Sequence, residues 1–241
     1  MMARVAPDGY DVFVLMFDET SGTTNTNTGT LGSAGNFTQY GNPVLGAQGL
    51  FGKALYIPSS FISSNHDGSG GANDVLITPN ISMSGWVFVR RQPNFFGEVW
   101  NKQYFLNGWS TPFLSFGIQM DNGSNGSWTF YITTSGTLKS VSSTANFQMR
   151  QSKWLHVGGT WDGTTLRMYI NGSLANSTVP GGGAIDYGTA GNRGQWYAGA
   201  IPGSSTVQGG PVIVQDLRIA NVVRPQSYFA NIYYNGLYVN G

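Results

Sequence analysis

The sequence contains no cysteine and few charged residues. Without cysteine, none of its 241 residues can form a disulfide, a zinc–thiolate site or a thiol nucleophile. Charged residues make up 10% of the chain, well below the roughly 25% of an average soluble domain. The polar surface therefore depends on Ser, Thr, Asn, Gln and Gly. The net charge is +1 and no basic cluster exceeds Arg90-Arg91, which argues against nucleic-acid binding.

Long apolar runs and a secretion signal are also missing. No run reaches the roughly 18 apolar residues that would predict a membrane span, so we expect no membrane partner. The short apolar run at residues 12–17 lacks the basic start and the cleavage site of a signal peptide, and we interpret it as a strand. We therefore expect a chain that is made without a signal peptide.

Short apolar segments separated by turn residues dominate the chain. The pattern is strongest at residues 153–179, where Asp162-Gly163 and Asn171-Gly172 separate three segments of alternating polarity. These dipeptides favour tight hairpin turns, and the alternation gives each strand one buried face. Further strands are expected at residues 10–17 (an edge or outer strand), 51–57, 82–90, 112–120, 127–134, 137–141, 195–200 and 212–219.

The remaining segments are predicted to be loops and one short helix. Loops are expected at residues 20–40, 59–73, 95–111 and 181–194, because they are rich in Gly and Ser or lack alternation. Pro225 and Gly236 bracket a short helical tail. Strands spaced 8–15 residues apart predict an all-β fold of two antiparallel sheets, a jelly-roll sandwich. With no repeat and no linker, we expect a single domain over residues 1–241.

Six short blocks follow one another along the chain, at residues 17–22, 51–55, 81–87, 154–163, 166–172 and 216–221. Their order resembles the laminin-G-like, concanavalin A-like lectin/glucanase superfamily over residues 17–236. The resemblance implies a jelly roll with one concave sheet. Members bind sugars or proteins, often with one calcium ion. Some are glycosidases, and many unsecreted members are bacteriophage virion proteins. The fold alone does not choose among these functions.

The carboxylates do not fit a glycosidase. Glucanases of this superfamily carry the pattern Glu-x-Asp-x-x-Glu on one strand, whereas this chain has only Glu19 and Glu98 and no Glu-x-Asp. A retaining glycosidase needs two carboxyl groups about 5–5.5 Å apart, but Asp18 and Glu19 are strand neighbours that point to opposite faces. We expect no enzyme activity and no catalytic residue. His156 lies in a predicted strand and is interpreted as a hydrogen-bonded structural residue rather than a general base.

If the chain binds a metal, calcium held by loop oxygens is the expected ion. Calcium takes 6–8 oxygen ligands, among which carboxylates are prominent. The candidate ligands are Asp67 and Asp74 in one glycine-rich loop, and Asp121 and Asn122 in the turn at residues 121–126. The alternatives are a flexible loop for the first pair and a plain hairpin turn for the second.

Aromatic residues supply the candidates for ligand contact. Exposed rings are the usual platform for sugars. The segment at residues 95–109 is dense in aromatic residues, and it either covers the core or exposes a binding patch. The candidate residues for contact with a glycan or partner are Trp100, Tyr104, Trp109, Tyr187 and Trp196. Three further tryptophans, Trp86, Trp154 and Trp161, alternate with apolar residues and are expected in the core.

The C-terminal tail is too aromatic for a free chain end. We expect it to dock on the sandwich or on a neighbouring subunit. The candidate residues for a subunit contact are Tyr228, Phe229, Tyr233 and Tyr234.

The leading hypothesis is a non-enzymatic bacteriophage virion protein that decorates the capsid or forms part of a tail or fibre and contacts host glycans. Such a protein would be assembled in the host cytoplasm as an oligomer, with other virion proteins as partners. The lack of a signal peptide, the absence of cysteine and the low charge motivate this hypothesis. The alternative is a calcium-assisted carbohydrate-binding module of a bacterial surface protein or enzyme. A polysaccharide partner is compatible with both.

Overall fold

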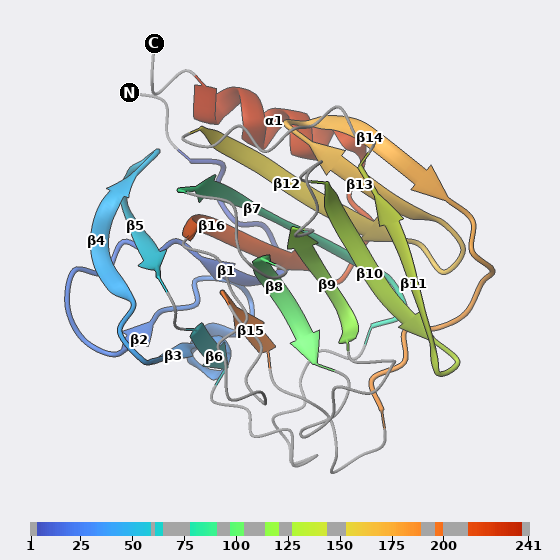
Figure 1. The fold of residues 1–241 in the computed structure, drawn as a ribbon, viewed down its shortest axis with the longest axis horizontal. Helices are drawn as coiled ribbons and strands as arrows, with labels where there is room; N and C mark the ends of the chain where they lie inside the picture. The colour runs from blue at the N-terminus through green and yellow to red at the C-terminus, as the bar shows by residue number, and fades with distance from the viewer. Residues whose placement is uncertain are drawn as a thin grey trace.

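The computed structural model describes residues 4–58, 61–64, 78–90, 97–103, 114–120, 127–143, 153–188, 196–199 and 212–237. Two antiparallel sheets pack face to face, and one helix lies outside them (Figure 1). The predicted all-β jelly-roll sandwich with a helical tail is confirmed. No helix in the described ranges is both long and apolar enough to cross a membrane.

Sheet A contains the turn-rich segment that the sequence predicts most strongly. Its strands are, in spatial order, β14 (Ser173–Thr178), β13 (Leu166–Ile170), β12 (Trp154–Trp161), β7 (Ile81–Val89), β16 (Val212–Ala220), β5 (Gly52–Ile57) and β4 (Val44–Gly49). β1 (Asp11–Leu15) pairs with β16 on the same edge as β5. Asn171 and Gly172 both have positive φ, 51° and 77°, as the tight turn between β13 and β14 requires.

Sheet B faces sheet A across the core. Its strands are, in spatial order, β11 (Thr137–Ser142), β10 (Trp128–Thr134), β9 (Leu114–Met120), β8 (Gly97–Gln103), β15 (Trp196–Ala198), β6 (Phe61–Ser64), β3 (Phe37–Tyr40) and β2 (Thr24–Asn25). A short 3-10 helix, η1, spans Gly32–Gly35. The predicted hairpin at residues 112–134 is confirmed as β9 and β10.

Several strands lie where loops were predicted, and these predictions were wrong. The predicted loop at residues 20–40 contains β2 and β3, and those at 59–73 and 95–111 contain β6 and β8. β4 was not predicted. These strands are short or mix apolar and polar residues without a regular alternation, so pairing with neighbours in the sheet defines them. β1, which was expected to be an edge or outer strand, pairs with β16 alone among the described strands, and all five of its residues are buried.

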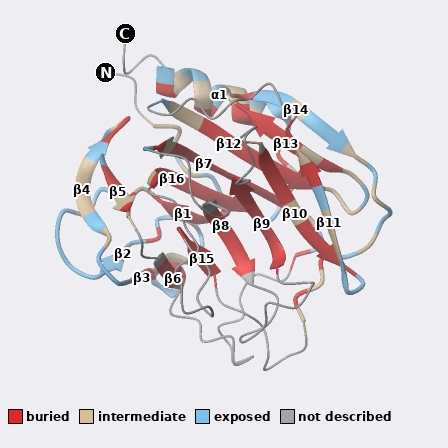
Figure 2. Cartoon of the chain, viewed as in Figure 1, coloured by how far each residue is buried: buried red, intermediate tan, exposed pale blue. Residues whose placement is uncertain are grey.

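Aromatic side chains fill the core between the two sheets. The ring of Trp196 lies 4.8 Å from the ring of Phe13 and 5.1 Å from that of Phe116, measured between centroids. Trp161 and Trp128 are fully buried in the same cluster. The strands in the middle of both sheets are buried along most of their described length (Figure 2). The prediction that Trp161 lies in the core is confirmed.

Helix α1 (Gln226–Leu237) covers part of the outer face of sheet A (Figure 1). The ring of Phe229 stacks on Tyr169 at 4.3 Å between centroids. A Cβ on Gly158 would lie 2.7 Å from the Phe229 ring, and one on Gly159 would lie 2.5 Å from the Phe130 ring of sheet B. Consecutive strand residues point to opposite faces, so this glycine pair admits a ring from each side. The tail therefore docks on its own sandwich, which confirms one of the two alternatives.

We expect Gly158→Ala to lower the free energy of unfolding by about 1–3 kcal/mol, because the added methyl group would displace the buried Phe229 ring. Urea denaturation measures the change. Gly9→Ala is the matched control, since a Cβ there meets nothing within 4 Å. Equal stability of the two variants would contradict the close packing of α1 on β12.

Candidate functional site

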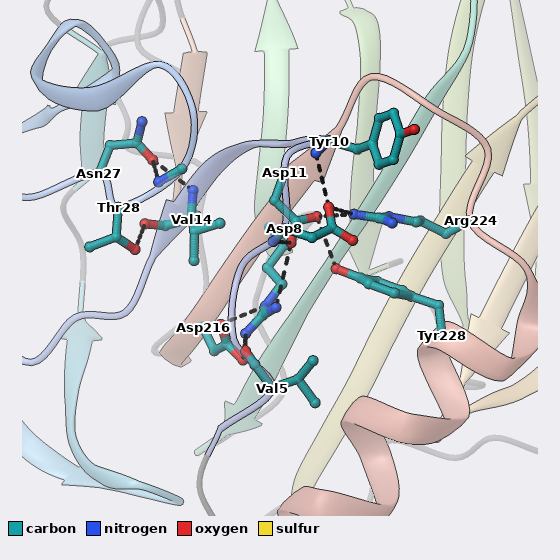
Figure 3. Close-up of polar contacts among 12 residues, drawn as sticks. Val5, Asp8, Tyr10, Asp11, Val14, Asn27, Thr28, Asp216, Arg224 and Tyr228 are labelled. Carbon is teal, nitrogen blue, oxygen red and sulfur yellow. Dashed lines mark hydrogen bonds and ion pairs between the residues drawn. The ribbon is translucent and has the colours of Figure 1, made fainter.

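A cluster of charged residues, buried except for Asp8, joins distant parts of the chain. We call Asp8, Asp11, Asp216, Arg218 and Arg224 the charge cluster (Figure 3). Arg224 donates from Nη2 to Asp11 Oδ1 at 2.7 Å, and Arg218 donates from Nε to Asp216 Oδ1 at 2.8 Å. The cluster thus links the segment before β1, β1 itself, β16 and the residues just before α1.

An irregularity in β16 places two members of the cluster side by side. The pairing between β16 and β7 shifts between Gln215 and Arg218, as in a β-bulge, and Asp216 adopts a φ of 51°. Asp216 then accepts two hydrogen bonds from Arg218, at Oδ1 and Oδ2. Residues two apart on a strand share a face, and the extra residue turns Leu217 and Ile219 towards the core and leaves Arg218 on the outer face.

Tyr228 of α1 completes the cluster. Its hydroxyl donates to Asp11 Oδ1 at 3.1 Å, and burial raises the pKa of the phenol, so it remains a protonated donor. Arg218 also donates to the backbone carbonyl of Val5. Figure 3 shows these side chains converging from the N-terminal segment and from the start of α1. The cluster therefore holds the N-terminal segment and the helix on sheet A.

The carboxylates show no arrangement for acid–base catalysis among the side chains that the structure describes. Each accepts at least one hydrogen bond from a guanidinium, a hydroxyl or a backbone N–H. These carboxylates are Asp8, Asp11, Asp18, Glu19, Asp162, Asp186 and Asp216. Asp162 accepts from the backbone N–H of Thr164 and Thr165 at the turn after β12, which confirms it as a turn former.

His156 is buried between two aromatic rings. Its ring centroid lies 5.2 Å from that of Trp86 and 6.3 Å from that of Phe229. Neither ring nitrogen has a hydrogen-bond partner, so the prediction of a hydrogen-bonded histidine was wrong. Desolvation, with a smaller contribution from the charge of Arg218, lowers the pKa of His156 to about 3. The residue is structural, because a buried imidazole cannot reach a substrate.

The outer face of sheet B carries a row of polar residues and one glycine in direct register across its eight strands. The row consists of Ser140, Tyr131, Gly117, Asn101, Tyr197, Ser63, Thr38 and Thr24. Its middle is buried: Asn101 is 0%, Ser63 1% and Tyr197 5% exposed. The centre of this face is therefore closed to a ligand.

The outer face of sheet A carries a different row, which we call the aromatic row. It joins β12, β7, β16, β5 and β4 through direct register pairs and consists of Trp154, Phe88, Ile213, Tyr56 and Val44. All five residues are half-buried or exposed. Since neighbouring strands lie about 4.8 Å apart, the row extends for about 19 Å. It is the most extended apolar surface in register that the described strands leave accessible to a ligand.

The aromatic row begins where α1 ends. Trp86 stacks on Tyr233 of the helix, and Phe88 points to the same face two residues further along β7. The rings of Phe88 and Trp154 lie 5.6 Å apart and are tilted by 59°, so they do not form one flat surface. The sequence analysis placed Trp154 in the core, which was wrong. Trp154 pairs with Phe88 on the outer face of sheet A. The row joins residues from five strands, so no pattern within one segment could have identified it.

The predicted glycan-contact residues lie elsewhere. Trp100, Tyr187 and Trp196 are only 3–4% exposed, so the prediction of an accessible contact surface was wrong for them. Trp100 stacks on Phe37 at 5.4 Å, and Tyr187 exchanges hydrogen bonds with the backbone of Thr78. All three belong to the core cluster, Trp100 and Trp196 from β8 and β15 and Tyr187 from the segment that follows β14. Tyr104 and Trp109 lie outside the described residues.

The predicted metal ligands are not among the described residues. Asp67, Asp74, Asp121 and Asn122 all lie outside them. Within the described ranges, no group of three or more His, Asp or Glu side chains could hold a metal ion. The calcium site therefore stays a prediction.

The predicted subunit-contact residues are mostly used within the chain. Phe229 is fully buried, Tyr228 binds Asp11, and Tyr233 stacks on Trp86. Only Tyr234 is largely exposed, at 56%. The contact prediction was wrong for Phe229, because its ring packs on Gly158 and Tyr169.

Comparison with known proteins agrees with this fold. The family model of the concanavalin A-like lectin/glucanases superfamily matches residues 65–227. No curated protein matches the sequence.

Solved structures with the same fold include sugar-binding domains. Domain 4 of AbnA, a GH43 extracellular arabinanase from Geobacillus stearothermophilus solved with arabinotriose, is 17% identical with a TM-score of 0.65, over 93% of this chain and 98% of that domain. The receptor-binding domain of the botulinum neurotoxin C/D mosaic serotype is 14% identical with a TM-score of 0.65, over 93% of this chain and 51% of that chain.

The binding domain of botulinum neurotoxin DC in complex with SialylT is 11% identical with a TM-score of 0.62, over 94% of this chain and 52% of that chain. The chain thus spans about half the length of the neurotoxin structures. At these identities the likeness establishes the fold, which is that of lectin-like binding domains.

We expect Arg224→Met to lower the free energy of unfolding by about 3–5 kcal/mol, because it leaves the buried carboxylate of Asp11 without its closest cation. Arg167→Met is the control. Its partner Asp162 is partly exposed, so the loss should stay within about 1 kcal/mol. Similar losses for both variants in urea denaturation would contradict the structural role of the charge cluster.

His156 should make the fold sensitive to acid. Its pKa is about 3 when folded and about 6.5 when unfolded, so only the unfolded state takes up a proton between these values. Its contribution to stability is complete above pH 6.5 and is lost as the pH falls towards 3.

At pH 4.5, two pH units below the unfolded pKa, the loss should reach about 2–3 kcal/mol relative to pH 7. His156→Leu removes the titrating group and with it this loss of stability in acid. The free energy of unfolding should therefore fall less for the variant than for the wild type as the pH is lowered. Urea denaturation at pH 7, 5.5 and 4.5 measures it, and a difference that does not change with pH would contradict the depressed pKa.

Proposed function

Because the chain belongs to the concanavalin A-like lectin/glucanases superfamily, we propose that it is a non-enzymatic, lectin-like domain that binds carbohydrate at the aromatic row. The observation that carries the proposal is the row itself, with its half-exposed rings of Trp154, Phe88 and Tyr56 in register on sheet A. The sugar complexes of the AbnA domain and of the neurotoxin DC domain give additional support.

The chemistry of the row suits a sugar ring. One face of a pyranose presents C–H groups, which pack on an aromatic ring while the hydroxyl groups remain in water. Because the rings of Trp154 and Phe88 are tilted by 59°, one sugar unit can lie flat on only one of them. A chain of several sugar units can then contact successive members of the row. An open surface of this kind favours weak binding that depends on several contacts.

Two features support binding without catalysis. The described carboxylates are already engaged in hydrogen bonds, and none belongs to the aromatic row. Glycoside hydrolysis requires two carboxyl groups, one on either side of the bond that is cleaved. The proposed ligand would therefore be bound and released unchanged.

A role as a bacteriophage virion protein, in capsid decoration or in a tail or fibre, is the second candidate. The low charge favours it, since the charge cluster buries several of the few charged side chains inside the molecule. A surface with few charges can pack against other subunits without burying unpaired ions. Tyr234 and Leu237, both exposed on α1, offer the apolar contact that such packing requires.

We expect Trp154→Ala to weaken binding of the tightest oligosaccharide from a glycan array by about tenfold or more, which corresponds to about 1.4 kcal/mol, because it removes the largest ring of the row. Isothermal titration calorimetry measures the affinity. Leu174→Ala is the control, since Leu174 is 45% exposed on β14 at the other edge of sheet A and should leave the affinity unchanged.

The same titration in EDTA distinguishes binding at the aromatic row from binding at a calcium-assisted site. Binding at the aromatic row should persist, because the row has no carboxylate, whereas a calcium-assisted site would lose its ligand. Cosedimentation with undecorated phage capsids tests the virion role. If no array glycan binds to the wild type while capsids do, the proposed carbohydrate function is wrong and the second candidate replaces it.

A further inference from the structure

Arg90 differs from the other arginines that the structure describes. Four of them form ion pairs with aspartates: Arg4, Arg167, Arg218 and Arg224. Arg90 is exposed and has no ion-pair partner among the described residues, and its guanidinium carbon lies 5.0 Å from the centroid of the Tyr56 ring. It is therefore a cation held beside the aromatic row to which no described carboxylate is paired.

Arg90 directly follows Val89, the last residue of β7. Its spacing of two residues from Phe88 is compatible with the same outer face. Its contact with Tyr56 confirms this, since Tyr56 belongs to the same row two strands away. The stacking fixes the guanidinium over the row and leaves its N–H groups available to a ligand.

No described carboxylate lies in the strand segments that form the row. The segments at residues 43–45, 55–57, 87–90, 153–155 and 212–214 contain two cations, Arg90 and Lys153, and no Asp or Glu. The charged side chain that these segments are shown to place against the row is therefore a cation, Arg90, although the chain as a whole is close to neutral. A positive group beside apolar rings is complementary to a ligand that combines an apolar ring face with a negative charge.

We propose that the ligand of the aromatic row is an acidic oligosaccharide, whose sugar ring packs on Trp154 or Phe88 and whose carboxylate binds Arg90. This inference rests on the proposed carbohydrate function and adds the class of sugar. A guanidinium presents two parallel N–H donors that match the two oxygens of a carboxylate. Arg90 would thus favour acidic sugars, whereas the aromatic rings would contact acidic and neutral sugars alike.

The test compares two probes that differ only in charge: a short oligogalacturonate and its methyl ester, both titrated in EDTA at low salt. The wild type should bind the acid at least about tenfold more tightly than the ester. Raising the sodium chloride concentration to about 0.5 M should reduce this preference, because salt screens exposed charges.

Arg90→Met should abolish the preference and keep the affinity for the ester, since the rings remain. Arg90→Lys should restore part of it, because lysine keeps the charge without the two-donor geometry. Arg167→Met, which removes a cation paired with Asp162, is the control and should retain the full preference.

Three outcomes separate this inference from the function on which it rests. Equal affinity of the wild type for acid and ester, or a preference that survives in Arg90→Met, would overturn the acidic ligand while leaving carbohydrate binding intact. The acidic ligand would also be overturned if the glycans that bind most tightly on the array are all neutral. Failure of the wild type to bind any glycan would overturn the proposed function itself.

Discussion

The buried ion pairs of Arg218 and Arg224 are the interaction on which the arrangement of this molecule depends. They share Asp11, which lies on β1, and they bring the N-terminal segment and the start of α1 to the same place on sheet A. Charges removed from water are stable only while each keeps its partner. The cluster therefore tolerates one geometry, and this geometry sets the position at which α1 begins.

The position of α1 decides which part of sheet A is covered. The helix passes over Gly158 and ends over Trp86, so it buries His156 as well. The aromatic row crosses β7 at Phe88, two residues beyond Trp86, and its residues are left half-buried or exposed. The contacts that stabilise the fold and the surface proposed for the ligand are thus neighbouring parts of one sheet face.

The two outer faces of the sandwich reverse the usual distribution of polarity. On sheet B a row of polar side chains is buried in its middle, around Asn101 and Tyr197. On sheet A an apolar row remains accessible. An accessible apolar surface costs free energy in water, and a ligand that covers it recovers part of this cost. The contrast between the faces is the reason for placing the ligand on sheet A.

The sequence by itself determined the strands and the class of fold. Asp162-Gly163 and Asn171-Gly172 predict their turns because few other residues accept the required backbone angles, and the alternation in β12 and β13 is local. Short strands such as β2 and β3, of two and four residues, escaped, because so few residues show no clear alternation and pairing in the sheet defines them. Only the tertiary structure decided which aromatic residues are exposed. Alternation separates the two faces of a strand, but β7 is apolar on both faces over residues 85–89. The aromatic row unites five strands between residues 44 and 213, and its register follows from their packing.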